Sequence, residues 1–422
     1  MGDGCIYFVN GHIEDTNCAE GAQRCLPFSR VDPVAFADIA RAFEDSVNKR
    51  GIVRRREQGW LPRIFPFTGY GSSTSLYVLA RAVMADPASE QPFTLPFLPK
   101  ATHGLLPWGS QRPVSSLLDT HNPAIDAMDD MVERASATAE NAQRGWRQFF
   151  TTQVGFLPVT VEIAGQTIET RTDTNGYVSL LVENHGLAPG WHEARITPIV
   201  GEPTVAPVVV VDPDATIGLV SDIDDTVVVT WLPRAFLAAW NSFVLRTNTR
   251  TPVPGMAEFY RELLAGRPNA PVFYLSTGAW NTLPAMQAFI HANNLPIGPL
   301  LMTDWGPIPT GLFRSGQEHK IKQLRNLIIT FPNIRWILVG DDGQHDPYIY
   351  SELAREHRDH VAGIAIRELN PVEKVLSQGA LVGLDPHTQA ATQVPHSIPA
   401  ISGKDGHVLL KKYRALRQKF GE

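Results

Sequence analysis

Four short apolar runs in the second half of the chain limit what it can fold into. They span residues 217–220, 272–275, 334–339 and 364–366, and segments of helical length lie between them. A continuous apolar run indicates a strand that is buried on both faces. Strands joined by helices form a parallel sheet with right-handed crossovers. We therefore expect an α/β domain with a Rossmann-like parallel sheet over residues 213–384.

The first half of the chain has a different pattern. Residues 159–163 and 167–171 alternate apolar and polar side chains with a period of two. This alternation is typical of half-buried antiparallel strands. Asn175 and Gly176 provide a turn before a further strand. We expect an all-β sandwich domain over residues 58–212, with a helical insert at about 113–150.

The sequence at the two ends of the chain indicates simpler structures. We expect residues 1–57 to be an N-terminal extension with one helix, which begins at Asp32 and Pro33. Residues 385–422 are expected to be a flexible tail that ends in a basic amphipathic helix over 404–420. Such a helix either lies on an anionic membrane, as a peripheral contact, or docks against its own protein.

Composition argues against several classes of protein. The formal net charge is −6 and there is no long basic run, so we expect no nucleic-acid partner. No apolar stretch is long enough to span a membrane, and the first residues lack the pattern of a secretory signal. Cys5, Cys18 and Cys25 have no metal-binding spacing, so we expect reduced thiols of no assigned role in a cytoplasmic protein. Nothing in the sequence indicates an oligomeric state.

Acidic side chains follow two of the buried runs. Asp222 and Asp224 lie just after the first run, and Asp341 lies two residues after the third, with Asp346 close behind. Ligands bind at the carboxyl ends of the strands of an open α/β sheet. Carboxylates projected together from a buried strand are unfavourable unless a cation or a reaction requires them. This pattern predicts an active site.

Other polar groups complete a set suited to phosphoryl transfer. Ser276 and Thr277 follow the second run and suit phosphate oxygens, and Lys320 lies on the helix before the third. A carboxylate nucleophile, a second acid, a lysine and Mg²⁺ bound by oxygen ligands together predict hydrolysis of a phosphomonoester through an aspartyl-phosphate. Lys322, two residues further along the helix, is expected to point elsewhere.

The order of these motifs resembles that of the haloacid dehalogenase-like phosphatase superfamily. The similarity is greatest to the actin-patch-associated phosphatidate phosphatase family and its bacterial relatives. The matching segments are 221–226, 253–256, 331–332, 338–341 and 345–350. The resemblance is strong over about residues 215–370 and implies a parallel sheet of the haloacid dehalogenase type.

The resemblance also implies a role for each matching position. Asp222 would be the nucleophile and Asp224 the general acid and base. Thr226 would support the loop, and Ser276 and Lys320 would hold the phosphoryl group.

A magnesium site is implied at the same place. Asp222, Asp341 and the Asp224 carbonyl would bind Mg²⁺, and Asp346 would lie in the surrounding shell. The chain departs from the family at Asp342, where serine is common. This extra carboxylate either tightens the metal site or takes the place of Asp346.

The substrate implied by the resemblance is phosphatidate, converted to diacylglycerol and phosphate. Two alternatives stay open: the same chemistry on a soluble phosphomonoester or phosphoprotein, and a non-catalytic scaffold that binds membranes or proteins. An apolar segment at 231–244 occupies the place of the superfamily's flap and either admits acyl chains or packs in the fold. Trp280 likewise either lines the pocket or belongs to the core.

Overall fold

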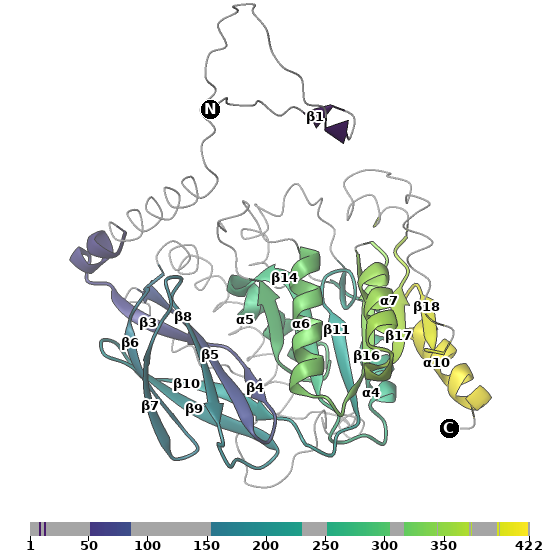
Figure 1. Cartoon of the computed structure of the whole chain (residues 1–422), viewed down its shortest axis with the longest axis horizontal. Helices are drawn as coiled ribbons and strands as arrows, with labels where there is room; N and C mark the ends of the chain where they lie inside the picture. The colour runs from purple at the N-terminus through teal and green to yellow at the C-terminus, as the bar shows by residue number, and fades with distance from the viewer. Residues whose placement is uncertain are drawn as a thin grey trace, which may run out of the picture.

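The computed structural model of the chain describes residues 51–85, 153–229, 251–303, 316–343, 345–370 and 397–420, with short pieces at 8–9, 12–13, 373 and 395. An all-β part and an α/β part lie side by side (Figure 1). The helix expected from Asp32, the insert at 113–150 and the apolar segment at 231–244 lie outside the described residues.

Eight strands build the all-β part. They are β3 (Leu61–Pro66), β4 (Gly69–Gly71), β5 (Ser75–Ala85), β6 (Pro158–Ile163), β7 (Gln166–Arg171), β8 (Tyr177–Glu183), β9 (Gly190–Pro198) and β10 (Thr204–Val210). Their order is β3-β5-β4-β10-β9-β6-β7, and β8 pairs with β5. All pairs are antiparallel except β4 with β10, so the strands predicted here are confirmed. Near the N-terminus, β1 (Phe8–Val9) pairs with β2 (His12–Ile13).

Alternation along these strands explains their burial. Val159, Val161 and Ile163 of β6 are buried in one core, and the residues between them face outward. A strand with this period places every second side chain on the same face. Asp173 closes the turn before β8, because its Oδ1 accepts hydrogen bonds from the N–H groups of Asn175 and Tyr177, both at 2.8 Å.

Six parallel strands build the sheet of the α/β part. They are β11 (Ile217–Asp222), β14 (Val272–Ala279), β15 (Leu300–Thr303), β16 (Arg335–Asp341), β17 (Val361–Arg367) and β18 (Ala400–Gly403). Their spatial order is β15-β14-β11-β16-β17-β18. The chain therefore moves outward on one side of β11 and then returns to build the other side. A hairpin of β12 (Val228–Val229) and β13 (Thr251–Pro252) follows β11.

The two edge strands were not predicted from the sequence. β15 and β18 have four residues each, and such short segments carry no resolvable periodicity. β18 corrects the expected flexible tail, because residues 400–403 pair with the end of β17. The neighbouring strand supplies the hydrogen bonds that select this conformation.

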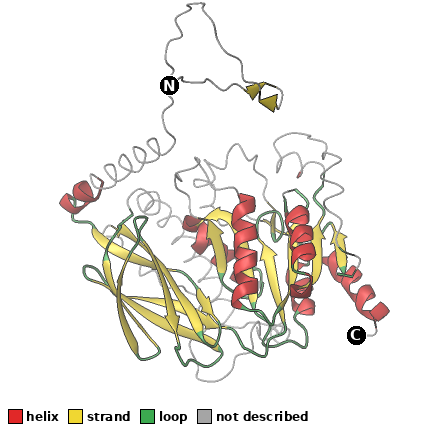
Figure 2. Cartoon of the chain, viewed as in Figure 1, coloured by secondary structure: helices red, strands yellow, loops and turns green. Residues whose placement is uncertain are grey.

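Helices cover both faces of the parallel sheet (Figure 2). Leu219 of β11 lies in a core with α4 (Met256–Leu263), α5 (Leu283–Ala292) and α10 (Gly406–Phe420). Val220, the next residue, lies in the opposite core with α6 (Gly316–Thr330) and α7 (Asp346–Glu356). Two 3₁₀ turns, η4 (Trp280–Thr282) and η5 (Arg358–His360), complete this part. Burial on both faces explains why these strands are continuous apolar runs.

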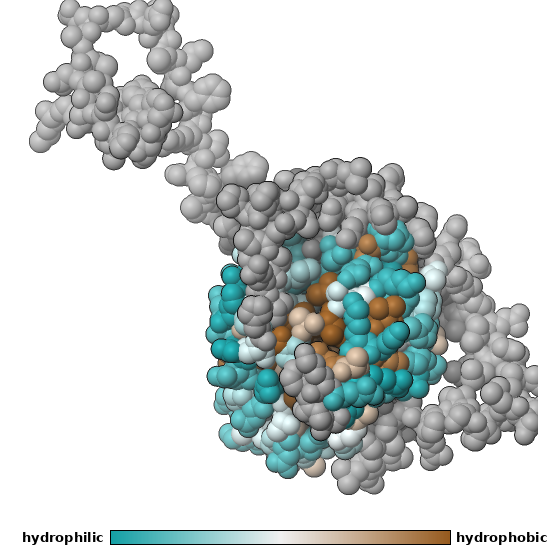
Figure 3. All heavy atoms as spheres, turned by 90° about the vertical axis from the view of Figure 1, so that its right-hand side faces the viewer, coloured by the Kyte–Doolittle hydropathy of each residue, from teal (hydrophilic) through white to brown (hydrophobic). Residues whose placement is uncertain are grey.

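The basic C-terminal helix docks against its own protein. Leu409 of α10 is fully buried, and the Tyr413 ring meets the Phe259 ring of α4 edge to face at 6.3 Å. Arg414 bonds to Glu262 at 2.7 Å. The face of the molecule on the α10 side mixes hydrophilic residues with apolar ones (Figure 3). Among the described residues, no helix is long and apolar enough to cross a membrane.

Aromatic contacts join the two parts of the chain. Phe67, after β3, stacks on Trp280 with ring centres 4.2 Å apart and planes at 17°. Tyr70 of β4 meets Phe273 of β14 edge to face at 5.1 Å. Trp280 is therefore packed against the all-β part, directly after the segment that carries Ser276 and Thr277.

Candidate active site

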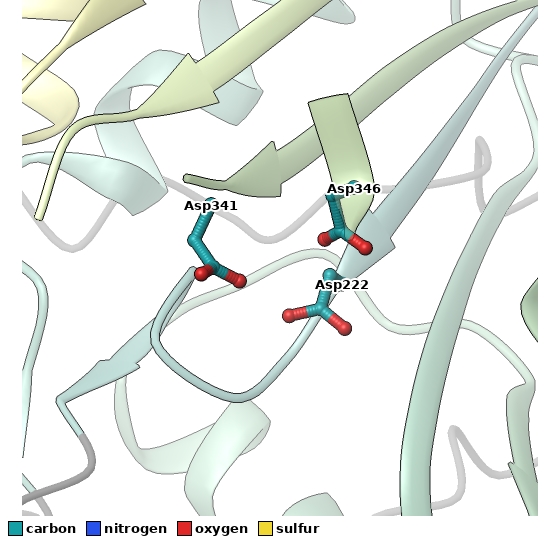
Figure 4. Close-up of side chains that lie close together, drawn as sticks. All are labelled: Asp222, Asp341 and Asp346. Atoms are coloured by element: carbon teal, nitrogen blue, oxygen red, sulfur yellow. The ribbon is translucent and has the colours of Figure 1, made fainter. Parts of the chain in front are cut away.

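The predicted acids meet where the order of the parallel sheet reverses. β11 lies between β14 and β16, so the chain leaves its carboxyl end in one direction and returns on the other side. Such a switch point leaves a crevice that helices cannot fill. Asp222 ends β11, Asp341 ends β16, and Asp346 begins α7. Figure 4 shows the three carboxylates directed toward one another.

The cluster is buried and tight. Asp222, Asp341 and Asp346 each have at most 1% of their surface exposed, and each offers a carboxylate oxygen within 4.8 Å of the others. The Lys320 ammonium lies 2.6 Å from Asp222 Oδ1 and 2.5 Å from Asp346 Oδ1. Lys322 is exposed on the same helix, as expected. Four of the predicted groups thus converge on one point.

Burial and mutual repulsion work against ionised carboxylates here. Burial raises the pKa of Asp222 well above its usual value; Lys320 opposes this, while Asp346 and Asp224 add to it. The pKa of Asp341 is also raised, first by burial and then by Asp346 and Asp222. Burial alone would lower the pKa of Lys320, but the surrounding carboxylates outweigh it and leave that pKa raised. One buried cation thus faces three carboxyl groups.

The unmatched charge fits a hard divalent cation. Asp341 Oδ2 and Asp346 Oδ2 are buried and accept no hydrogen bond from any residue that the structure describes. Buried carboxylate oxygens normally have such partners. All three donors are carboxylates, and ions such as Mg²⁺ prefer oxygen ligands. The residues therefore fit a metal site.

The loop after β11 places the second acid beside the predicted phosphate-binding segment. Thr226 Oγ1 donates to Asp222 Oδ2 at 3.0 Å, so Thr226 contacts the predicted nucleophile from within the same loop. Ser276 Oγ donates to Asp224 Oδ2 at 3.1 Å and accepts from the Gly278 N–H at 2.9 Å. Asp224 and Ser276 therefore lie together at this edge, although they are 52 residues apart.

Two of the predicted residues, Thr277 and Asp342, make hydrogen bonds that hold neighbouring segments together. The carbonyl of Thr277 accepts a hydrogen bond from Thr303 Oγ1 at 2.8 Å, so Thr277 holds its segment to β15. Asp342 is not among the three clustered carboxylates. Its Oδ1 accepts a hydrogen bond from the Leu369 N–H at 2.8 Å. Asp346, rather than Asp342, therefore accompanies Asp341 in the cluster.

Several residues at the site were missed in the sequence. Tyr260 of α4 places its hydroxyl 2.6 Å from Ser221 Oγ, and Ser221 Oγ donates to the Asp222 carbonyl at 2.6 Å. Arg367 donates to the Asp225 carbonyl. Arg367 follows the fourth buried run directly, and Asp341 lies two residues after the third. The rule that found the acids, a charged residue behind a buried strand, also applies to it.

Comparison with known proteins shows which family the segment that carries the site is similar to. Residues 217–368 match the family model described as Phosphatidate phosphatase APP1, catalytic domain. The chain is 28% identical over 152 residues to Phosphatidate phosphatase APP1 of Saccharomyces cerevisiae, covering 36% of this chain and 26% of that protein. It is 27% identical over 157 residues to an uncharacterized protein of Schizosaccharomyces pombe, covering 36% and 25%. The chain thus spans about a quarter of the length of these relatives.

A comparison of folds adds no further assignment. One match is the crystal structure of a carbohydrate acetylesterase from Xanthomonas citri, at 10% identity and a TM-score of 0.23. It covers 59% of this chain and 62% of that chain. At this score the likeness carries no argument about fold or function.

Proposed function

We propose that this chain is a phosphatase that removes the phosphate of phosphatidate and leaves diacylglycerol. The match of residues 217–368 to the catalytic-domain model of a phosphatidate phosphatase supports this proposal. The observation that carries the proposal is the cluster at the end of β11. There the buried Lys320 contacts the predicted nucleophile Asp222 at 2.6 Å, and the three clustered carboxylates together fit a metal ion.

Asp222 is held in a single orientation for attack. Lys320 donates to its Oδ1 at 2.6 Å and Thr226 donates to its Oδ2 at 3.0 Å. A carboxylate fixed in this way loses little freedom when it reacts. In the proposed first step, an oxygen of Asp222 bonds to phosphorus while the bond from phosphorus to the substrate alkoxide breaks.

Asp224 is placed for the proton transfers. Its Oδ2 accepts from Ser276 Oγ at 3.1 Å, so it lies beside the segment proposed to bind the phosphoryl oxygens. In the first step Asp224 gives its proton to the leaving alkoxide. In the second, it takes a proton from the water that attacks phosphorus, which releases phosphate and frees Asp222. Ser276, Thr277 and Lys320 hold the phosphoryl group meanwhile.

Asp222, Asp341 and Asp346, with the main-chain carbonyl of Asp224, are the proposed ligands of Mg²⁺. When bound, the ion would offset the repulsion between these carboxylates and the phosphate dianion. The two buried carboxylate oxygens without a hydrogen-bond partner among the described residues support this assignment.

The substrate class is tested by phosphate release. The purified chain is incubated with phosphatidate in vesicles and with soluble phosphomonoesters, each with Mg²⁺ and with chelator. We expect release from the vesicles that depends on Mg²⁺. Release from soluble esters alone would replace the lipid assignment by the soluble one. No release from any substrate would favour a non-catalytic scaffold.

The Asp222→Asn variant tests the nucleophile. An amide cannot form the acyl phosphate, so we expect at least a thousandfold loss of turnover, in line with the loss of other catalytic nucleophiles. Asp214→Asn is a matched control, since Asp214 lies in the exposed linker before β11. Wild-type turnover in Asp222→Asn would refute the aspartyl-phosphate mechanism.

We also propose a fold type for each of the two parts of the chain. The strand order of the parallel sheet supports an arrangement of the haloacid dehalogenase type. The core shared by β3 and by β5 to β10 supports a β-sandwich. A cytoplasmic location and a peripheral contact with the membrane stay predictions.

A further inference from the structure

The loop that carries both proposed catalytic acids contains one residue in an unfavourable conformation. Asp225 lies between Asp224 and Thr226 and has φ of +58°, in the left-handed region. Residues with a side chain seldom adopt this region, although aspartate does so more readily than most. Asp225 is also 4% exposed, so solvent does not stabilise this turn. Contacts from elsewhere in the fold must hold it.

Arg367 supplies such a contact from two strands away. Its Nη1 donates to the Asp225 carbonyl at 2.7 Å, across 142 residues of sequence. Arg367 ends β17, and β16 lies between β17 and β11. The guanidinium thus reaches past β16 to the main chain of the catalytic loop. A second bond, from Nε to the Lys404 carbonyl at 3.4 Å, ties it to the end of β18.

Glu373 fixes the guanidinium in turn. Its Oε1 accepts from Arg367 Nη2 at 2.7 Å, and both side chains are 6% exposed. Glu373 Oε2 accepts from the Asn370 N–H, and Asn370 Oδ1 accepts from the Glu373 N–H, both at 2.9 Å. These reciprocal bonds have the pattern of a capping box, which holds the carboxylate in a single position. A buried guanidinium with two fixed neighbours has little freedom to move.

The same segment is attached to the second acidic loop. Asp342 Oδ1 accepts from the Leu369 N–H at 2.8 Å, and the Asp342 N–H donates to the Arg367 carbonyl at 3.0 Å. Asp341, the residue before Asp342, belongs to the carboxylate cluster. Arg367 and Leu369 therefore connect the two loops whose carboxylates must meet.

We propose that Arg367 and Glu373 are positioning residues that set the conformation of the Asp222–Thr226 loop, with Asp342 holding the same segment to the loop of Asp341. The inference rests on the proposed phosphatase function for its kinetic consequences only. Arg367 acts on the main chain of Asp225 and through it on the acids on either side. Its removal should therefore change the rate of the chemical step more than the binding of substrate.

The test uses the full chain and a double variant, Arg367→Gln with Glu373→Gln. Changing both residues together leaves neither Arg367 nor Glu373 as a buried charge without its partner. The fold is therefore preserved better than by a single change. The matched control is Arg325→Gln with Glu356→Gln. That pair also bonds at 2.7 Å, but its side chains are 47% and 40% exposed and it joins α6 to α7. Arg367→Lys, which keeps the charge, is the conservative variant.

Two measurements report on the loop. The first is amide hydrogen exchange at Thr226, Val227 and Val228, whose N–H groups all donate to the Ile223 carbonyl. We expect exchange there to accelerate about tenfold or more in the double variant and not in the control. The second is steady-state kinetics, in which we expect kcat to fall about 10- to 100-fold with KM within about twofold. Arg367→Lys should recover part of kcat.

The outcomes separate the two proposals. Unchanged exchange in a folded double variant would overturn the positioning role, whatever the activity. If exchange is faster in the double variant but the wild-type chain itself releases no phosphate, the positioning role is supported and the proposed function is not. An equal loss of kcat in the exposed-pair control would also overturn the inference, because the effect would then not arise at the loop.

Discussion

Neutralising Asp341 should stabilise the protein in the absence of a divalent cation. Asp341 Oδ1 accepts the Gly343 N–H at 2.7 Å, and an asparagine oxygen can accept the same bond. Asp341→Asn therefore removes a charge while it keeps the shape and the turn. Proteins often gain stability when a strained functional site is relaxed in this way.

The size of the effect follows from the spacing of the cluster. At 4.8 Å, the upper limit of the separation between these oxygens, two ionised carboxylates repel each other by about 3.5 kcal/mol at an effective dielectric constant of about 20. Asp341 faces two such neighbours, Asp222 and Asp346. Protonation relieves part of this repulsion, because burial and these neighbours raise the pKa of Asp341. We expect a net gain of about 1–4 kcal/mol, similar to the range seen when a whole buried ion pair is replaced by apolar residues.

The assay is thermal unfolding at pH 8 with chelator. At about 2–4 °C per kcal/mol, the variant should melt several degrees above the wild type. Mg²⁺ at a hundred times its Kd should add about 2.7 kcal/mol to the free energy of unfolding of the wild type and so raise its Tm. The Tm of the variant should not change. Asp342→Asn is the control, since an amide oxygen there still accepts the Leu369 N–H. A folded Asp341→Asn variant that melts at or below the wild type in chelator would refute the reasoning.

Further predictions concern pH, the nucleophile and the contact between the two parts. Burial raises the pKa of Asp222 and Asp341, so the folded state binds more protons than the unfolded chain, and stability in chelator should fall as pH rises above about 4. Thermal melts between pH 4.5 and 8 check this; a Tm that rises over that window would contradict it. Thr226→Val removes the bond to Asp222 Oδ2 and should lower kcat about tenfold, whereas Thr226→Ser should restore most of it; equal rates for both would exclude the bond as the cause. Phe67→Ala removes the ring stacked on Trp280 and should cost about 3–5 kcal/mol by urea unfolding; a loss below about 1 kcal/mol would mean that the stack contributes little.

Much of the fold was predictable from local patterns. Continuous apolar runs identified the four central strands of the parallel sheet, because burial on both faces leaves no room for alternation. Period-two alternation identified antiparallel strands such as β6 and β7. β15 and β18 were not found, since four residues at the edge of a sheet carry too little signal and depend on hydrogen bonds from β14 and β17.

The candidate site was predictable to a similar degree. Asp222 and Asp341 could be paired in advance because all strands of a parallel sheet end at the same edge. Whether Asp342 or Asp346 accompanies them depends on where α7 begins. The number of residues in a loop does not determine which way each side chain of the loop points. The structure assigns that place to Asp346 and directs Asp342 to Leu369.

What the sequence alone determined is the chemistry: which carboxylates, hydroxyls and ammonium group lie behind buried strands, and therefore at one edge. Local patterns decide this, because a continuous apolar run marks a strand of a parallel sheet, and all strands of such a sheet end at the same edge. Only the tertiary structure decided the partners: Lys320 between two acids, and Arg367 on the Asp225 carbonyl. Those contacts join residues up to 142 positions apart, and their geometry depends on the packing of the whole sheet and its helices.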